Sequence, residues 1–150
     1  MIKIIKKLHS SMLNPFHLAI EVHDLNAARE FYVNILKCKE GRSDTLWIDF
    51  NFYGHQLVCH LNKKMKIADT SNNVDGNEIP IPHFGVVLNM SDWNIIADQL
   101  VSFNIDFIVE PYIRFKGLPG EQATMFFYDP SGNSIELKAF KDIKRQLFKK

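Results

Sequence analysis

Short runs of alternating apolar and polar residues mark the first half of the chain. Residues 16 to 22 (FHLAIEV) alternate in this way and are rich in branched side chains, which predicts a β-strand. Asp24 can cap a helix that follows to about residue 36. One face of this helix is apolar at helical spacing, with Leu25, Ala28, Phe31, Tyr32 and Ile35. Three further strands are predicted near residues 38–42, 46–52 and 56–61.

The same order of elements returns in the second half of the chain. Residues 83 to 88 (HFGVVL) predict a strand, and Ser91 can cap a helix to about residue 103. Further strands are predicted at residues 106–110, 123–128 and 134–140. The sequence therefore predicts one strand–helix–three-strand unit that occurs twice. Such a unit buries both of its faces most easily by packing against its copy, with a cleft where the two sheets meet.

Two segments lack a periodic pattern and are predicted as loops. Residues 62–80 are polar and form a linker between the halves, and residues 111–122 (PYIRFKGLPGEQ) form a loop beside the cleft. We therefore expect a single α+β domain over residues 1–150, with a cleft-shaped mixed sheet. Its modules span about 14–62 and 80–140, with a linker at 63–79 and a C-terminal tail at 141–150.

Composition narrows the classes of partner. The hydrophobic fraction of 46% allows a sizeable core, and the net charge of +1 gives no reason to expect nucleic acid. Basic residues near both ends, such as Lys3 and Lys149, are interpreted as solvated tails. The two cysteines, Cys38 and Cys59, do not make a disulfide framework. With no apolar stretch long enough for a membrane span and no secretory signal, we expect a cytoplasmic protein without membrane contact.

Three residues at related positions predict a metal site. His17 and His83 begin the equivalent first strands of the two modules, and Glu136 lies in the middle of the final strand. A carboxylate in a core strand needs a cation, since burying it unpaired is costly. Two imidazoles and one carboxylate leave coordination positions open, and this donor set suits Fe(II), Mn, Ni, Co or Zn.

Other polar residues are candidates for contact with a substrate. Gln56 and His60 share a face of the fourth strand, and either could be a fourth ligand or a substrate contact, with His60 also an acid or base. In the loop 111–122, Tyr112 is a further candidate, and Arg114 or Lys116 could neutralise an acidic substrate. A solvated loop is the competing interpretation.

Three segments, FHLAIEVHDLNAAREFYVNIL, PHFGVVL and FFYDPSGNSIELKAF, resemble the vicinal oxygen chelate superfamily. This group includes glyoxalase I, methylmalonyl-CoA epimerase, fosfomycin- and bleomycin-resistance proteins and extradiol dioxygenases. The resemblance covers about residues 14 to 140. It implies paired βαβββ modules that form a cleft, a homodimer, and metal ligands at the positions of His17, His83 and Glu136.

The resemblance leaves the reaction class open. Lyase and isomerase members usually carry a further Glu ligand on the fourth strand, where this chain offers Gln56, Val58 and His60. Extradiol dioxygenases resemble it in a two-His-one-Glu Fe(II) site, and they carry a Tyr ten residues before the Glu ligand. Here that position is Phe126, with Tyr128 two residues on.

These features slightly favour a ring-cleavage dioxygenase that uses Fe(II) and acts on a small substrate with two chelating oxygens. His60 and Tyr128 are its candidate catalytic residues, and Phe126 is a candidate substrate contact. A lyase or isomerase like glyoxalase or the epimerase is one alternative, and a non-catalytic small-molecule-binding protein of the resistance type is another. A structural dimer whose histidines simply pack is the weakest.

Overall fold

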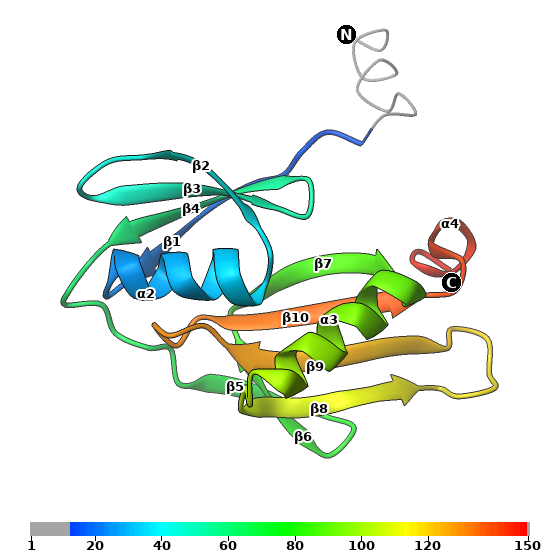
Figure 1. Ribbon diagram of the computed structural model, residues 1–150. Coiled ribbons are helices and arrows are strands. Elements are labelled where there is room, and N and C mark those ends of the chain that lie inside the picture. The colour runs from blue at the N-terminus through cyan, green and yellow to red at the C-terminus, as the bar shows by residue number, and fades with distance from the viewer. Residues whose placement is uncertain (1–12, 150) are drawn as a thin grey trace, which may run out of the picture.

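The computed structural model describes residues 13–149, which form two four-stranded sheets, a separate hairpin and two main helices (Figure 1). The predicted basic tail around Lys3 lies outside these residues. Each sheet combines parallel and antiparallel neighbours, so the predicted α+β class with mixed sheets is confirmed. Within residues 13–149, helices of the length and apolar character that a bilayer crossing requires are absent.

The first module follows the predicted order closely. Its strands have the spatial order β1-β4-β3-β2, and β1 runs parallel to β4. Asp24 caps the helix as expected, because its side chain accepts hydrogen bonds from the backbone N–H groups of Asn26 and Ala27. The helix begins as an α-helix and continues with π-helical hydrogen bonding. The elements are β1 (His17–Val22), α2 (Leu25–Arg29), η1 (Glu30–Ile35), β2 (Lys39–Ser43), β3 (Trp47–Phe52) and β4 (His55–Leu61).

The second module repeats this topology. Its strands have the order β7-β10-β9-β8, with β7 parallel to β10. The duplication predicted from the sequence is therefore confirmed strand by strand. The elements are β7 (His83–Asn89), α3 (Met90–Ser102), β8 (Phe107–Arg114), β9 (Gln122–Tyr128) and β10 (Ser134–Phe140), followed by the short α4 (Ile143–Gln146).

Two predicted details of the second module are wrong. The cap of α3 is Asn89 rather than Ser91, and its amide oxygen accepts from the backbone N–H of Asp92. The strand β8 continues through Pro111 to Arg114, so the predicted loop is confined to residues 115–121. Pro111 is tolerated because β8 is an edge strand with one side free of ladder hydrogen bonds.

The polar segment 62–80, predicted as a linker without structure, contains most of a β-hairpin. Strand β5 (Thr70–Val74) pairs with β6 (Asn77–Ile81). Asp75 and Gly76 form the turn with positive φ angles of 52° and 81°, the combination that a tight two-residue hairpin turn requires.

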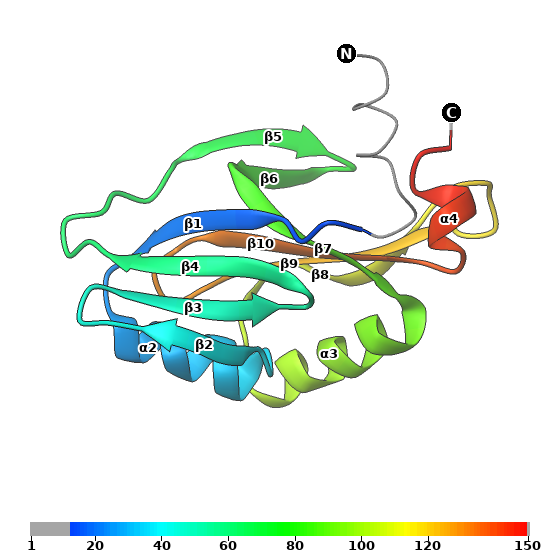
Figure 2. The ribbon, with the colours of Figure 1, turned by 90° about the horizontal axis from the view of Figure 1, so that it is seen from above.

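The elements form layers around one core (Figure 2). Helices α2 and α3 lie together on one side of the sheets, and the β5–β6 hairpin lies on the other side. Apolar side chains of both modules join in a single buried cluster on the helix side. Its largest fully buried members are Tyr32, Phe50, Phe127, Leu100 and Leu137, among others.

The turn between β9 and β10 ties the second module to the first. Asp129 in this turn accepts a 2.9 Å hydrogen bond from the Tyr32 hydroxyl, which lies on the helix of the first module. Burial and the nearby Asp129 carboxylate hold the pKa of Tyr32 well above its usual range, so the phenol stays a donor. Asn133 donates to the backbone oxygen of Glu21, and the hydroxyl of Ser131 contacts His23 at 2.8 Å. The turn is thus clamped to the end of β1.

Candidate metal centre

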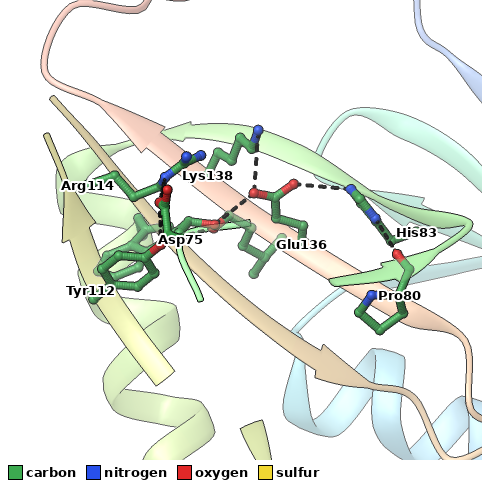
Figure 3. A network of polar contacts seen from close by, with 10 residues as sticks. Asp75, Pro80, His83, Tyr112, Arg114, Glu136 and Lys138 are labelled. Atoms are coloured by element: carbon green, nitrogen blue, oxygen red, sulfur yellow. Dashed lines mark hydrogen bonds and ion pairs between the residues drawn. The ribbon is translucent and has the colours of Figure 1, made fainter. Parts of the chain in front are cut away.

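His83 and Glu136 form a close pair on the face of the second sheet that lies away from the helices (Figure 3). Nε2 of His83 is 3.4 Å from Oε2 of Glu136. The other ring nitrogen, Nδ1, donates to the backbone oxygen of Pro80 at 2.7 Å, because a carbonyl oxygen can only accept. In a neutral imidazole this places the lone pair on Nε2, facing a carboxylate oxygen. A proton or a metal cation can be held between these two acceptor atoms, Nε2 of His83 and Oε2 of Glu136.

The surroundings of Glu136 leave one of its oxygens free. Only 9% of the residue is exposed, and Oε1 accepts a 2.7 Å hydrogen bond from the hydroxyl of Thr124. Nζ of Lys138 lies 3.4 Å from the same oxygen. Oε2 therefore remains for a ligand shared with His83, and the ring of Phe126 packs edge-on against that histidine. This arrangement is typical of a carboxylate that is oriented before it binds a cation.

Gly85 allows the strands that carry this pair to come close together. It lies opposite Glu136 in the parallel ladder of β7 and β10. A Cβ atom placed on Gly85 would lie 1.6 Å from the backbone oxygen of Glu136. The position therefore excludes every residue with a side chain unless the strands separate.

His17 lies on the first sheet and is held by a chain of hydrogen bonds. Its Nδ1 is 2.7 Å from Oε1 of Gln56, the residue beside it on β4. The amide nitrogen of Gln56 donates to the Asp49 carboxylate at 3.3 Å, which turns the amide oxygen toward the histidine. In a neutral ring, Nε2 of His17 is thus the nitrogen with the lone pair, as in His83. Gln56 orients the imidazole in this geometry, and its oxygen is engaged by that contact.

One chain brings together two of the three predicted metal ligands. Across residues 13–149, no group of three or more His, Cys, Asp or Glu side chains is placed to hold a metal ion. His83 and Glu136 meet on the second sheet, whereas His17 stands with Gln56 on the first. The chain therefore presents one half-site with two donors and a second half-site with one.

The predicted substrate contacts Tyr112 and Arg114 lie on β8, not on a loop. Both side chains bind the carboxylate of Asp75 at the tip of the hairpin. Figure 3 shows how this group and the His83–Glu136 pair belong to one stretch of the second sheet. A cavity of about 210 Å³ is lined by both regions, namely by Tyr112, Arg114, His83, Glu136 and also Phe126.

The two predicted catalytic residues are placed differently. Tyr128 is 43% exposed and lines a cavity of about 310 Å³ together with His83 and Ala19. His60 pairs in register with Glu21 at the far end of β4. It is four residues from Gln56, about 13 Å along the strand at the usual rise. The geometry therefore separates His60 from His17 and leaves Tyr128 beside His83.

Several residues of the site were not among the sequence candidates. Thr124 and Lys138 share the face of Glu136 by strand alternation, which is the signal that could have found them. Asp49 and Asp75 act through contacts between strands far apart in sequence. The hydroxyl of Ser134 is buried without a hydrogen-bond partner beside His83, and nothing in the sequence marks it.

The cysteines take no part in this site. Burial raises the pKa of Cys38 to about 12, and burial also raises the pKa of Cys59. Since the thiolate is the reactive form, neither thiol is prepared for nucleophilic chemistry. Both residues pack as small apolar groups in the core, as predicted for Cys59.

Solved structures resemble this chain over most of its length. A glyoxalase/bleomycin resistance protein/dioxygenase from Alicyclobacillus acidocaldarius is 33% identical, with a TM-score of 0.71, and the match covers 87% of this chain and 94% of that one. A fosfomycin resistance protein from Listeria monocytogenes is 18% identical, with a TM-score of 0.60 and coverage of 87% and 93%. A lactoylglutathione lyase from Agrobacterium tumefaciens is 16% identical, with a TM-score of 0.59 and coverage of 88% and 97%.

The last two likenesses concern the fold alone, while the first also extends to the sequence. No family model matches the chain, and no curated protein does. The doubled βαβββ topology and the 33% identity agree with each other. The chain belongs to the glyoxalase/bleomycin resistance/dioxygenase family, within the vicinal oxygen chelate superfamily.

Proposed function

We propose that this protein is a metal-dependent enzyme that acts on a small substrate with two adjacent oxygen atoms. The metal would be held by His83 and Glu136 of one chain and by His17. The observation that carries the proposal is the 3.4 Å approach of His83 Nε2 to Glu136 Oε2, with Nδ1 of the same ring bound to the Pro80 carbonyl. A divalent cation satisfies two such acceptors, and second-shell contacts of this kind are usual for metal-binding histidines.

A homodimer would complete the site with His17 from a second copy. Within one chain the two histidines belong to separate half-sites, and His17 is exposed on its sheet. A two-fold arrangement would join each His17 to the His83–Glu136 pair of the other copy and give two identical sites.

The donor set favours Fe(II) and ring-cleavage chemistry over the alternatives. The oxygen of Gln56 is engaged by His17, so the fourth strand adds no acidic ligand and the set stays at two histidines and one carboxylate. This set is typical of Fe(II) oxygenases with open coordination positions. A bound ferrous ion would supply a Lewis acid that holds both substrate oxygens and a place for dioxygen.

The remaining residues would bind and orient the substrate around this centre. Lys138, beside Glu136, is a cation that can stabilise negative charge developing on a substrate oxygen. Tyr128 is a candidate proton donor or acceptor because it is a phenol that lines the cavity that His83 also lines. Phe126 presents an apolar ring edge to the same histidine and keeps water from one side of it.

An isomerase or lyase reaction remains the second candidate. The likeness to a lactoylglutathione lyase extends over 88% of this chain. The position expected to carry the ring-cleavage tyrosine is Phe126, which cannot transfer a proton. Oxygen consumption with a catechol-type substrate would support the dioxygenase, while proton exchange at a carbon next to a carbonyl would support the alternative. The cytoplasmic location stays a prediction.

Metal analysis of protein purified without chelator tests the site. We expect about one Fe, Mn, Ni, Co or Zn per chain in the wild type, and no retained metal in folded His83→Ala or Glu136→Gln. His60→Ala is the matched control, because its distance from His17 predicts unchanged metal content. Unchanged metal in His83→Ala would contradict the site, and absence of metal under every loading condition would favour a binding protein without chemistry.

Mixed dimers test the shared site directly. A chain with His17→Ala and a chain with His83→Ala should each lose metal alone. Co-expression of the two should restore one metal per mixed dimer, because one of its two sites then contains intact His17, His83 and Glu136. No recovery in a purified mixed dimer would overturn the contribution of a second copy.

A further inference from the structure

The β5–β6 hairpin covers part of the second sheet and is held there at two points. Ile79 packs with Val109 and Phe126 in a small apolar cluster. At the tip, Asp75 binds Arg114 and Tyr112. Figure 2 shows the hairpin on the side of the sheets opposite the helices, and Ile79 places it against β8 and β9. The hairpin residues Val74 and Ile79 therefore line the same cavity as His83 and Glu136.

Arg114 is a partly enclosed cation whose carboxylate partner, Asp75, lies in the turn of the hairpin. Its side chain is 18% exposed, and its Nε lies 2.5 Å from Oδ2 of Asp75. The Tyr112 hydroxyl donates to the same oxygen at 3.2 Å. The hydrogen bond from Arg114 lowers the pKa of Asp75. A guanidinium and a phenol that converge on one carboxylate are a recognition site for carboxylates in general.

Asp75 holds this site with little other support. All five residues of β5 are exposed, and the Asp75 side chain is itself 41% exposed. An isolated two-stranded hairpin is marginally stable, and an exposed ion pair adds only modestly. A free carboxylate with the same hydrogen-bonding geometry can therefore compete with Asp75 for Arg114.

The distance between this group and the metal half-site suits a small molecule. Tyr112 pairs with Thr124, which pairs with Lys138, so β8 and β10 are separated by one strand. Their backbones are thus about 10 Å apart. Long side chains from both strands reach into the same cavity of about 210 Å³. Lys138 on its opposite wall adds a second cation.

We propose that Arg114 and Tyr112 form a carboxylate-binding subsite and that Asp75 occupies it until an acidic substrate displaces it. The substrate of the proposed enzyme is then a small organic acid, and this identification rests on the proposed function. Its carboxylate binds Arg114 while its chelating oxygens reach toward His83 and Glu136. Displacement of Asp75 frees the hairpin tip, so binding and opening of the hairpin are coupled.

Calorimetry on metal-free protein tests the subsite apart from the metal. The probes are butanoate and benzoate, each compared with its neutral amide. We expect the acids to bind and the amides not to bind. Asp75→Asn should tighten the binding of the acids at least fivefold, because it removes the competing carboxylate from the exposed turn without touching the core. Arg114→Met should abolish it, while Lys39→Met, at an exposed cation on β2 of the first sheet, serves as the control and should leave it unchanged.

Hydrogen exchange of residues 70–81 gives a second readout that needs no metal. Benzoate should speed exchange at the hairpin tip of the wild type, and Asp75→Asn should exchange fast without ligand. Equal affinity of wild type and Asp75→Asn for the acids, or binding retained in folded Arg114→Met, would overturn the proposal. Failure of metal binding would leave these measurements interpretable, so the two proposals can fail separately.

Discussion

At the third residue of their first strands the two modules carry Ala19 and Gly85, and the residues opposite on their last strands are Val58 and Glu136. The first pair is a small apolar contact with Val58 buried. The second pair places a carboxylate where the first has a methyl-bearing side chain, and only a glycine fits beside it. One strand-pair position therefore sets the two modules apart at the point where we propose that a cation binds.

The two histidines are anchored by different means. His17 is oriented by the side chain of Gln56, whereas His83 is oriented by the backbone oxygen of Pro80. A backbone anchor does not depend on the identity of a side chain, but a side-chain anchor does. The first half-site is therefore the one that a single substitution can disorder without removing a ligand.

The largest effect is expected from adding a side chain at Gly85. Gly85→Ala forces β7 and β10 apart and should lower the free energy of unfolding by about 3 kcal/mol, at the upper end of the cost of overpacking. Urea unfolding followed by circular dichroism measures the change. Ala19→Gly, the matched change in the first module, should cost no more than about 1 kcal/mol. Equal costs at the two positions would remove the distinction between the modules.

A smaller effect is expected from removing the anchor of His17. Gln56→Leu keeps all three proposed ligands but frees the imidazole, and it should weaken metal affinity about 10- to 100-fold. Competition with a chromogenic chelator measures the affinity, and Gln122→Leu on β9 is the control. Affinity equal to the wild type would show that Gln56 does not position the ring, and complete loss of metal would make it a ligand.

The smallest effect concerns how each helix is tied to its sheet. In the first module Arg29 binds Glu40 at 2.9 Å, and this hydrogen bond lowers the pKa of Glu40 from its ordinary value of 4.5. A carboxyl group whose pKa is lower in the folded state stabilises the fold at pH values above its unfolded-state pKa. This stabilisation is lost as the pH falls through the folded-state pKa. Arg29→Met should therefore cost less than about 1 kcal/mol at neutral pH, since the pair is partly exposed, and nothing in strong acid.

The second module supplies the control for this pH dependence. There Trp93 donates a buried 2.8 Å hydrogen bond to the backbone oxygen of Leu137, and neither group titrates. Trp93→Phe should lower the free energy of unfolding by the same amount at pH 7 and pH 4. Stability curves for both variants across this range measure the contrast, and a pH-independent cost for Arg29→Met would contradict it.

The repeated fold could be predicted from the sequence because its signals are local. Strand alternation, the Asp24 cap and the turn before β10 each depend on a few neighbouring residues. The hairpin was not predicted because β5 is exposed throughout and polar up to Val74, although Val74-Asp75-Gly76-Asn77 carries the Asp-Gly signal of a tight turn. Because the hairpin was not predicted, the contact of Asp75 with Arg114 was not predicted either.

The site was predictable only in part, since its contacts join distant strands. Alternation placed Glu136 on a face with Lys138, and the repeat placed His17 and His83 at equivalent strand starts. No pattern in one strand shows that the Gln56 oxygen turns to His17 because Asp49 holds its nitrogen. Such relations depend on the register between strands, which long-range packing sets.

The clamp between Asp129 and Tyr32 fixes the two modules of one chain relative to each other. The turn at the start of β10 is bonded to the helix and to the end of β1 of the other module, so each chain presents His17 and Glu136 on parts that cannot swing apart independently. In the proposed dimer, two copies would meet as preformed bodies, with the spacing between their half-sites fixed before they associate. Such a dimer would gain affinity for a metal from geometry already present in each subunit.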